Sequence, residues 1–147
     1  MKIHEINNQL LDKIESVMGV NREYDSDELT AMCNKTMKKE FNSVCSWSEY
    51  VPNKAKPYSI VNTDNTTGEH WVSAYFDGKT VFVYDSFART MRNLMKDFIQ
   101  RIKSMGFKIV FCNKGKDQAE QDINCGLRSF LFIYLTSIYG IRQTKNI

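Results

Sequence analysis

The chain has 147 residues, of which 42% are hydrophobic and 25% charged, and its formal net charge is +3. This length and composition are typical of one globular domain and exclude a disordered or fibrous protein. The longest apolar stretches fall short of the roughly 18 residues that a membrane-spanning helix needs, and the first residues lack a signal peptide's apolar run. We therefore expect neither membrane insertion nor secretion. The small positive charge does not indicate nucleic-acid binding, although it is compatible with a basic patch.

The cysteines and histidines predict neither a disulfide framework nor a metal site. The four cysteines form no Cys-x-x-Cys pair: Cys33, Cys45, Cys112 and Cys125. The two histidines, His4 and His70, are far apart, which does not fit the local ligand spacing of zinc sites. We expect reduced thiols in a cytosol-like compartment, no metal and no cofactor.

The first third of the chain is predicted to be helical. Apolar residues recur at helical spacing over 3–17, and a second amphipathic segment runs from Ser26, a candidate N-cap, toward Phe41. Cys33 and Cys45 fall in or near this second helix and are expected to be structural.

Two prolines mark the one natural seam of the chain, near 51–57. No repeat, linker or low-complexity tract divides the sequence further. We therefore expect a single domain, 1–147, that consists of a helical N-terminal part, 1–50, and a core, 57–147.

Three strands are predicted after the seam. The first covers 58–62, and the next two, 70–76 and 79–85, flank Asp77-Gly78, a dipeptide favoured in two-residue hairpin turns. If this dipeptide forms the whole loop, His70 lies directly opposite Asp85, with their Cβ atoms about 4.5–5.5 Å apart. The hairpin would then pair an imidazole with a carboxylate.

The last elements alternate between helix and strand. An apolar stripe predicts a helix over 90–106 that ends at a glycine, and 107–111 follows as a strand that Cys112 terminates. After a polar loop, 125–139 is apolar enough to be a buried helix with Cys125 at or near its N-terminus. The predicted order is two helices, three strands, helix, strand, helix, which is an α+β fold with helices packed on a small mixed sheet.

Cys125 is the strongest candidate for chemistry. A helix N-terminus offers backbone N–H groups and a positive dipole end, both of which favour thiolate over thiol. Gly126 would leave room for a substrate carbonyl, and Trp71 either fills the core or lines a cleft beside His70. A thiol nucleophile needs a base and a group that orients the base, so Cys125, His70 and Asp85 form a minimal catalytic set. The alternative is a buried structural cysteine and a structural histidine.

An acyl transfer also needs donors for the developing oxyanion. The backbone N–H of Cys125 is one candidate, and the second is the side-chain amide of Gln118 or Gln121. Seven residues between Gln118 and the cysteine leave enough chain for the loop to turn into the helix, whereas four residues leave little. Gln118 is therefore favoured.

Several motifs occur together in a specific order. They are Tyr58-Ser59-Ile60-Val61-Asn62-Thr63, Gly68-Glu69-His70-Trp71-Val72, Val83-Tyr84-Asp85-Ser86-Phe87, and Gln118 followed seven positions later by Cys125-Gly126-Leu127. This combination resembles the adenovirus endopeptidase (adenain) family and, more loosely, the SUMO-deconjugating proteases. The similarity covers about half the chain.

The resemblance implies a papain-like cysteine protease core. In it His70 is the base, Asp85 its orienting carboxylate, Cys125 the nucleophile and Gln118 the oxyanion donor, while Trp71 borders the substrate groove. Adenain uses a glutamate at the position of Asp85, and the SUMO proteases use an aspartate. The expected function is that of a cysteine endopeptidase that cleaves next to small residues.

The resemblance also suggests a setting. We expect a viral or virus-like maturation protease that acts on structural precursors such as capsid proteins. It would work in the cytoplasm or nucleus of a host cell or inside the virion. The sequence does not decide whether the protein needs a peptide or DNA activator.

Other functions use the same residues. A ubiquitin-like-protein (SUMO-type) deconjugating protease would need a surface for a folded modifier, which the sequence does not reveal. An acetyltransferase can form an acyl-thioenzyme from acetyl-coenzyme A with the same triad. A non-enzymatic binding module is disfavoured because all three triad residue types are present together with a glutamine.

Overall fold

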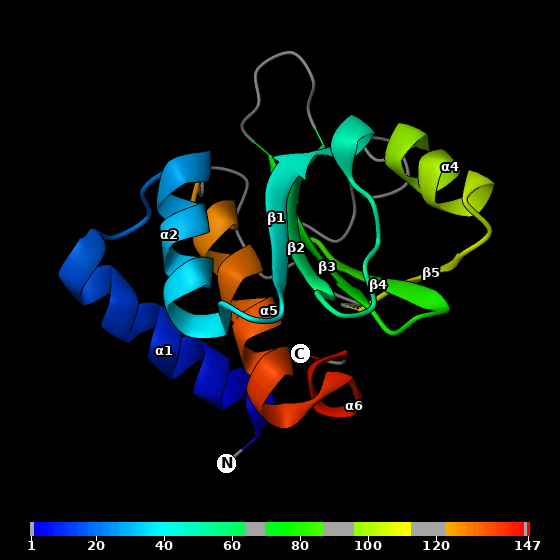
Figure 1. Ribbon diagram of the computed structural model, residues 1–147. Helices are drawn as coiled ribbons and strands as arrows, with labels where there is room; N and C mark the ends of the chain where they lie inside the picture. Colours follow the sequence, from blue (N-terminus) through cyan, green and yellow to red (C-terminus); the bar gives the residue numbers. More distant parts are fainter. Residues whose placement is uncertain (1, 64–69, 87–95, 113–122, 146) are drawn as a thin grey trace.

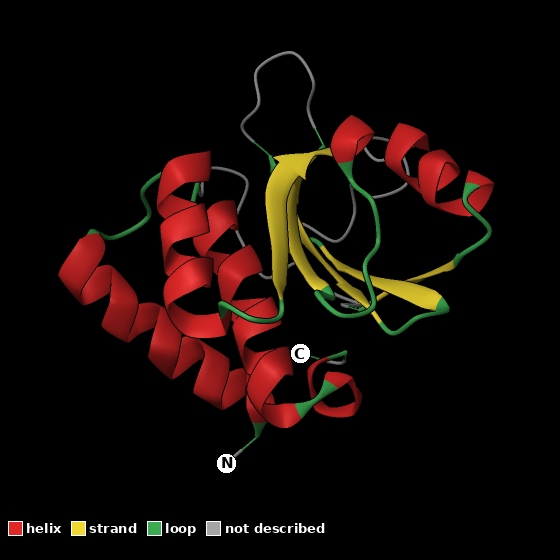
Figure 2. Cartoon of the chain, viewed as in Figure 1, coloured by secondary structure: helices red, strands yellow, loops and turns green. Residues whose placement is uncertain are grey.

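The computed structural model describes residues 2–63, 70–86, 96–112, 123–145 and 147 as a mixed β-sheet with helices on both faces (Figures 1 and 2). The elements are α1 (Ile3–Met18), α2 (Ser26–Met37), β1 (Phe41–Ser46), a 3₁₀ helix η1 (Trp47–Glu49), β2 (Tyr58–Asn62), β3 (Trp71–Phe76), β4 (Thr80–Tyr84), α4 (Lys96–Ser104), β5 (Lys108–Phe111), α5 (Cys125–Tyr139) and α6 (Ile141–Thr144). The α+β class is confirmed. The predicted order lacked β1 and the short α6.

The sheet has five strands in the order β1-β2-β3-β4-β5. The outer pairs, β1 with β2 and β4 with β5, are parallel, and the two inner pairs are antiparallel. Strand β3 is therefore central, between the strands that precede and follow it in the chain.

Each face of the sheet has its own hydrophobic core. On the face covered by α1, α2 and α5, Ile60 and Tyr84 belong to the same buried cluster as Leu131. On the opposite face, Val72 packs in a cluster with Phe98 of α4. Helix α5 is apolar on nearly all sides because it is enclosed between the sheet and the other helices. This location holds the first residue of α5 against the sheet.

The N-cap of helix α2 lies one residue earlier in the chain than predicted. Asp25, not Ser26, is the N-cap, and it forms a capping box with Glu28: the Asp25 carboxylate accepts from the Glu28 N–H at 2.8 Å, and Glu28 accepts from the Asp25 N–H at 3.2 Å. The helix ends at Met37 instead of continuing toward Phe41. The Asp25 carboxylate thereby satisfies an N–H group of the first helical turn that has no partner within the helix.

The prediction that the first third is entirely helical is wrong. Strand β1 lies within the expected helical part, 1–50, and pairs with β2, so this part contributes an edge strand to the sheet. Cys45 consequently lies on β1 and not in a helix, while Cys33 is buried in α2 as expected. The strand was missed because only its first residue is fully buried, which leaves no clear alternation.

The β3–β4 hairpin differs from the predicted register by two residues. Phe76 pairs with Val81 and not with Lys79. The Asp77 N–H donates to the Thr80 carbonyl at 3.1 Å, so Asp77 lies between the end of β3 and the turn instead of forming the turn.

The turn itself consists of Gly78 and Lys79. The Asp77 carboxylate accepts the N–H groups of Lys79 at 2.8 Å and Thr80 at 2.7 Å, and Gly78 has φ +101°. A positive φ at the first turn position is a glycine conformation. The carboxylate therefore stabilises a turn displaced by one residue from the Asp-Gly prediction.

The later elements match their predictions closely. Helix α4 lies within the expected 90–106, of which 90–95 is outside the described residues, and β5 covers four of the five residues expected over 107–111. Helix α5 has the predicted bounds, with Cys125 as its first residue. No helix in the described ranges is long and apolar enough to cross a lipid bilayer.

Candidate active site

His70 and Asp85 meet at one end of the β3–β4 hairpin. His70 immediately precedes β3 and Asp85 directly follows β4, and in an antiparallel pair these two ends are adjacent. Nε2 of His70 lies 3.1 Å from Oδ1 of Asp85. The Asp85 side chain is fully buried, whereas the His70 side chain remains 15% exposed. The buried Asp85 carboxylate therefore holds the His70 imidazole, which is still partly accessible to solvent.

This pair forms although the two residues are not directly opposite. Side chains of a strand alternate with a period of two, so a register shift of two residues leaves His70 and Asp85 on the same side of the hairpin. Asp85 becomes a diagonal neighbour. A shift of one residue would have separated the two side chains.

Cys125 reaches the same point from α5. The Trp71 backbone N–H points at the Cys125 sulfur at 3.5 Å, and the His70 side chain hydrogen-bonds Cys125 as well as Asp85. Because Nε2 of His70 is engaged by Asp85, Nδ1 is the ring nitrogen left for the thiol. The three predicted triad residues are thus brought together in the order carboxylate, imidazole, sulfur.

The surroundings of His70 favour the protonated imidazole. Burial opposes the charged ring, but the hydrogen bonds and electrostatic interactions with Asp85 and Cys125 outweigh it and raise the pKa of His70 to about 9. A protonated ring beside the sulfur stabilises a thiolate and can later give up its proton.

Trp71 is a structural part of the site. Its side chain is buried, its indole N–H donates to the Tyr24 carbonyl at 3.0 Å, and its own carbonyl accepts from the Ser129 hydroxyl at 3.1 Å. The sequence left open whether this residue fills the core or lines a cleft. It belongs to the core cluster, and the cavity that it also lines does not include His70.

Gly126 is needed for packing. A Cβ atom at this position would lie 3.1 Å from the Tyr24 side chain, 3.2 Å from Trp71 and 3.3 Å from Leu29. Side chains of the protein therefore occupy the space beside Gly126. The sequence suggested that this space would be open for a substrate carbonyl.

A polar network that the sequence did not predict anchors the start of α5. The buried Asn124 donates to the Glu15 carboxylate at 3.3 Å and accepts from Arg128 Nε at 3.1 Å. Asn21 adopts a left-handed backbone with φ +49° and accepts the Ile123 N–H at 2.9 Å. The only local signal was the four-residue spacing of Asn124 and Arg128. This network fixes the two residues before Cys125 to the end of α1.

The expected oxyanion donors are only partly visible. Gln118 and Gln121 lie outside the described residues. Cys125 is the first helical residue of α5, and the amides of a first helical turn point out of the N-terminal end, where the dipole favours negative charge. The chain thus provides the helix end that the backbone part of an oxyanion site requires.

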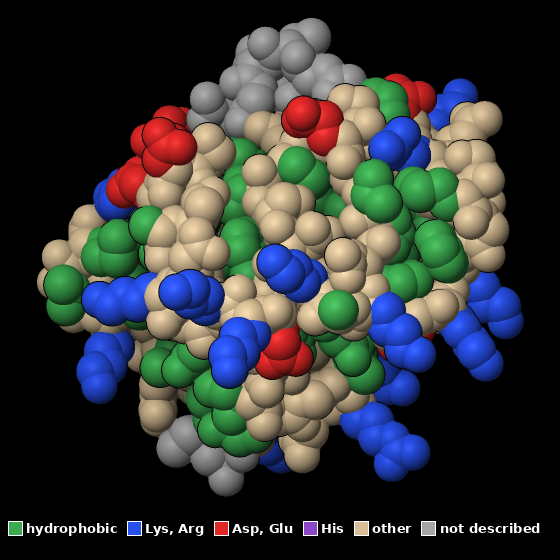
Figure 3. Space-filling view, viewed as in Figure 1, with side chains coloured by type: hydrophobic (Ala, Val, Ile, Leu, Met, Phe, Trp, Pro, Cys, Tyr) green, Lys and Arg blue, Asp and Glu red, His purple; other side chains and the backbone are tan. Residues whose placement is uncertain are grey.

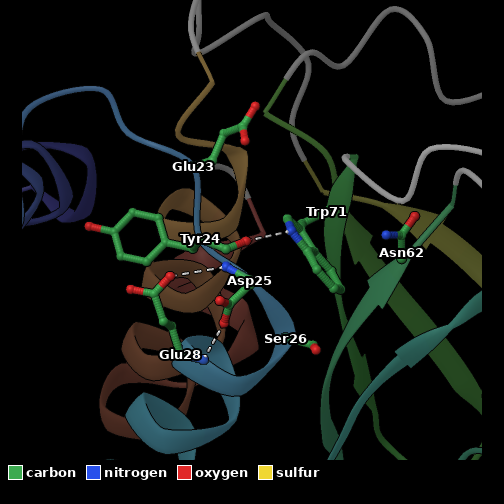
Figure 4. Close-up of a pocket in the computed structure, with 7 residues that line it drawn as sticks. All are labelled: Glu23, Tyr24, Asp25, Ser26, Glu28, Asn62 and Trp71. Carbon is green, nitrogen blue, oxygen red and sulfur yellow. Dashed lines mark hydrogen bonds between the residues drawn. The ribbon is translucent and has the colours of Figure 1, made fainter.

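A cavity of about 480 Å³ adjoins Trp71. Figure 4 shows its walls: the start of α2 lies on one side and β2 and β3 on the other. The lining residues are Glu23, Tyr24, Asp25, Ser26, Glu28, Asn62 and Trp71. Trp71 is the residue that connects the cavity with the triad, because its backbone N–H points at the Cys125 sulfur; Cys125, His70 and Asp85 themselves are not among the lining residues.

The other cysteines have different surroundings. Burial raises the pKa of Cys33 to about 12 and that of Cys112 to about 12, so both stay neutral thiols, and all four cysteines are free of disulfides. Within the described ranges, no group of three or more His, Cys, Asp or Glu side chains is arranged to hold a metal ion.

Comparison with known proteins assigns no family. No protein-family model matches the sequence, and no curated protein matches it significantly.

Proposed function

We propose that the protein is a cysteine endopeptidase with Cys125 as nucleophile, His70 as base and Asp85 as the group that orients the base. The observation that carries this proposal is the placement of the His70 ring between the Asp85 carboxylate, at 3.1 Å, and Cys125 at the start of a buried helix. Nucleophile, base and orienting group in hydrogen-bond contact are the arrangement that thiol catalysis needs.

Acylation begins with attack of the Cys125 thiolate on the carbonyl carbon of the scissile peptide. An S–C bond forms, and the carbonyl electrons move to oxygen, which the N-terminal end of α5 stabilises. The C–N bond then breaks as the His70 imidazolium gives its proton to the leaving amine. A thioester on Cys125 and a free amine result.

Hydrolysis of the thioester reverses the role of the base. The neutral His70 ring takes a proton from water, and the hydroxide attacks the thioester carbonyl. The C–S bond breaks, and the acid product leaves Cys125 as a thiolate beside a protonated His70. Throughout, Asp85 keeps the ring oriented and stabilises its positive charge.

The arrangement of the three residues also supports the proposal that the fold is a papain-like, adenain-like core. A nucleophile on the first turn of a helix, packed against a sheet whose strand carries the histidine, is the plan of papain-like cores, and the order His, acid, Cys along the chain is that of the adenain-like variant. By this resemblance the substrates are polypeptides cleaved next to small residues, among them viral structural precursors, and the setting is the host cytoplasm or nucleus or the virion. The cavity beside Trp71 is the place where residues next to the scissile bond would bind.

The test is incubation of the full chain with a peptide library, followed by mass spectrometry of the products. Wild type should cleave internal peptide bonds, and Cys125→Ala should lose at least about 10³ in kcat/KM. Cys45→Ala is the matched control, because Cys45 lies on β1 away from the triad and should retain wild-type rates.

Parallel incubations separate the rival functions. Release of a modifier from a SUMO-type conjugate without peptide cleavage would assign deconjugation. Transfer of an acetyl group from acetyl-coenzyme A to an acceptor peptide would assign acetyl transfer. If none of these incubations gives a product, the proposal is overturned and a non-enzymatic binding module is the remaining function.

An anionic activator is the partner that the surface charge supports. Six exposed lysines lie at the ends of elements remote from His70 and Asp85: Lys38, Lys39, Lys54, Lys56, Lys79 and Lys108. Figure 3 shows Lys and Arg side chains gathered across the lower part of one face. We propose that duplex DNA binds there, and stimulation of peptide cleavage by DNA that weakens with added salt is the expected result. Equal cleavage with and without DNA would argue against this partner.

A further inference from the structure

Helix α5 contacts the site at two points four residues apart. Cys125 begins the helix and Ser129 follows one turn later, so both side chains lie on the same face of the helix. Ser129 is fully buried, and its hydroxyl donates to the Trp71 carbonyl at 3.1 Å. The Trp71 N–H in turn points at the Cys125 sulfur at 3.5 Å. A single residue of β3 therefore links the two positions on the helix.

Trp71 can make both bonds because of its place in the sheet. The described β3–β4 ladder ends at the pair Ser73 and Tyr84, two residues short of Trp71. In an extended strand the N–H and C=O groups of one residue point to the same side. Here that side faces α5, so a partner that fixes the Trp71 carbonyl also fixes the direction of its N–H.

The Trp71 side chain alone does not set this geometry. Its indole N–H is bound to the Tyr24 carbonyl at 3.0 Å, and its ring packs beside Gly126. These contacts hold the ring against α2 and α5, whereas the Ser129 hydroxyl acts on the backbone. The residue whose carbonyl Ser129 binds, Trp71, directly follows His70, so the same bond also affects the backbone that carries the base.

We propose that Ser129 is a positioning residue for the nucleophile. Through the Trp71 carbonyl it holds the backbone so that the Trp71 N–H reaches the Cys125 sulfur and the His70 ring stays beside it. For turnover this inference rests on the proposed function, but for the reactivity of Cys125 it does not.

The decisive change is Ser129→Ala. Alanine suits a helix interior but leaves the Trp71 carbonyl without its buried donor, so the segment is free to shift away from the sulfur. We expect the rate of Cys125 alkylation by iodoacetamide at about pH 6 to fall roughly three- to tenfold, the range that one ordinary hydrogen bond represents. With a peptide substrate, kcat should fall by a similar factor while KM is unchanged.

Two further variants make the test specific. Ser129→Thr keeps the hydroxyl and should restore most of the reactivity. Ser137→Ala removes a hydroxyl from the same helix whose bond, at 2.6 Å, goes to the Tyr134 carbonyl within α5, and it should alkylate as wild type does. Peptide mapping reports modification of each cysteine, so a variant that had lost its fold would reveal itself by modification of the buried Cys33.

The outcomes are distinct. A loss of Cys125 reactivity in Ser129→Ala that is restored in Ser129→Thr supports the inference. Wild-type alkylation in Ser129→Ala, or an equal loss in Ser137→Ala, overturns it. If wild type cleaves no peptide while Cys125 alkylation still depends on Ser129, the proposed function fails and the positioning role stands.

Discussion

Replacing Asp85 with asparagine should lower the pKa of His70, because the change keeps the size of the side chain and removes its charge. In the native protein the pKa of His70 is raised from 6.5 to about 9 against the effect of burial. At about 1.4 kcal/mol per pKa unit, this difference corresponds to about 3 kcal/mol in favour of the imidazolium. Asp85 and Cys125 share this stabilisation, so the loss of one charge should lower the pKa of His70 by about one unit or more.

Proton NMR can follow this titration directly. The chain has only two histidines, and His4 is exposed on α1, so its ring signals provide an internal reference for those of His70. Asp12→Asn, which removes an exposed carboxylate of α1, is the matched control and should leave the His70 midpoint in place. A wild-type His70 that titrates at or below 6.5, or one that does not respond to Asp85→Asn, would refute the coupling between the two side chains.

The same coupling should appear in stability. The folded protein binds the His70 proton more tightly than the unfolded chain, so this contribution is fully present below a pH of about 6.5 and is lost as the pH rises to about 9. The difference in unfolding free energy between wild type and Asp85→Asn should therefore be largest near pH 6 and shrink toward alkaline pH. Urea denaturation at several pH values measures it, and a difference that grows with pH would contradict the assigned sign.

Three further results are expected. Limited iodoacetamide at about pH 6 should modify Cys125 before any other cysteine, since the helix N-terminus and the neighbouring imidazolium favour its thiolate, and peptide mapping that finds another thiol modified first would contradict this. Gln118→Ala should lower kcat by about 10²–10³ while Gln121→Ala stays near wild type, and the reverse pattern in steady-state kinetics would move the oxyanion donor to Gln121. Gly126→Ala should destabilise the fold by about 1–3 kcal/mol in urea denaturation, because the added methyl group meets three side-chain atoms at 3.1–3.3 Å; unchanged unfolding would show that this packing can relax.

Local sequence patterns were sufficient for most elements but missed β1 and the short α6. The bounds of α5 follow from a long, mostly apolar segment and those of β2 from a short β-prone segment, and neither signal depends on distant partners. Strand β1 depends on its parallel pairing with β2, and its half-buried residues carry no alternation. The hairpin turn shifted because the Asp77 side chain binds the N–H groups that follow it, an effect that dipeptide statistics do not include.

The candidate site was predictable where it depends on local order and not where it depends on tertiary contacts. The predicted pairing of His70 with Asp85 is correct although the predicted register is not. A shift of two residues, being an even number, leaves both side chains on the same side of the hairpin. The bond from Asn124 to Glu15 joins residues 109 apart in the sequence, and no local pattern predicts it. The bond from Ser129 to the Trp71 carbonyl depends on which face of α5 meets β3, and no local pattern predicts that face.

The division of the site between a hairpin and a distant helix has a consequence for folding kinetics. A β-hairpin forms within about 1–10 μs, so the histidine and its carboxylate can meet early. Cys125 joins them only when α5 docks on β3, which closes a loop of 54 residues between Trp71 and the sulfur and is intrinsically slower. A chain caught between these events carries an assembled base but an unassisted thiol. For the proposed protease, this order of events would delay activity until α5 has docked, and the time at which Cys125 becomes reactive during refolding is expected to report the docking of α5.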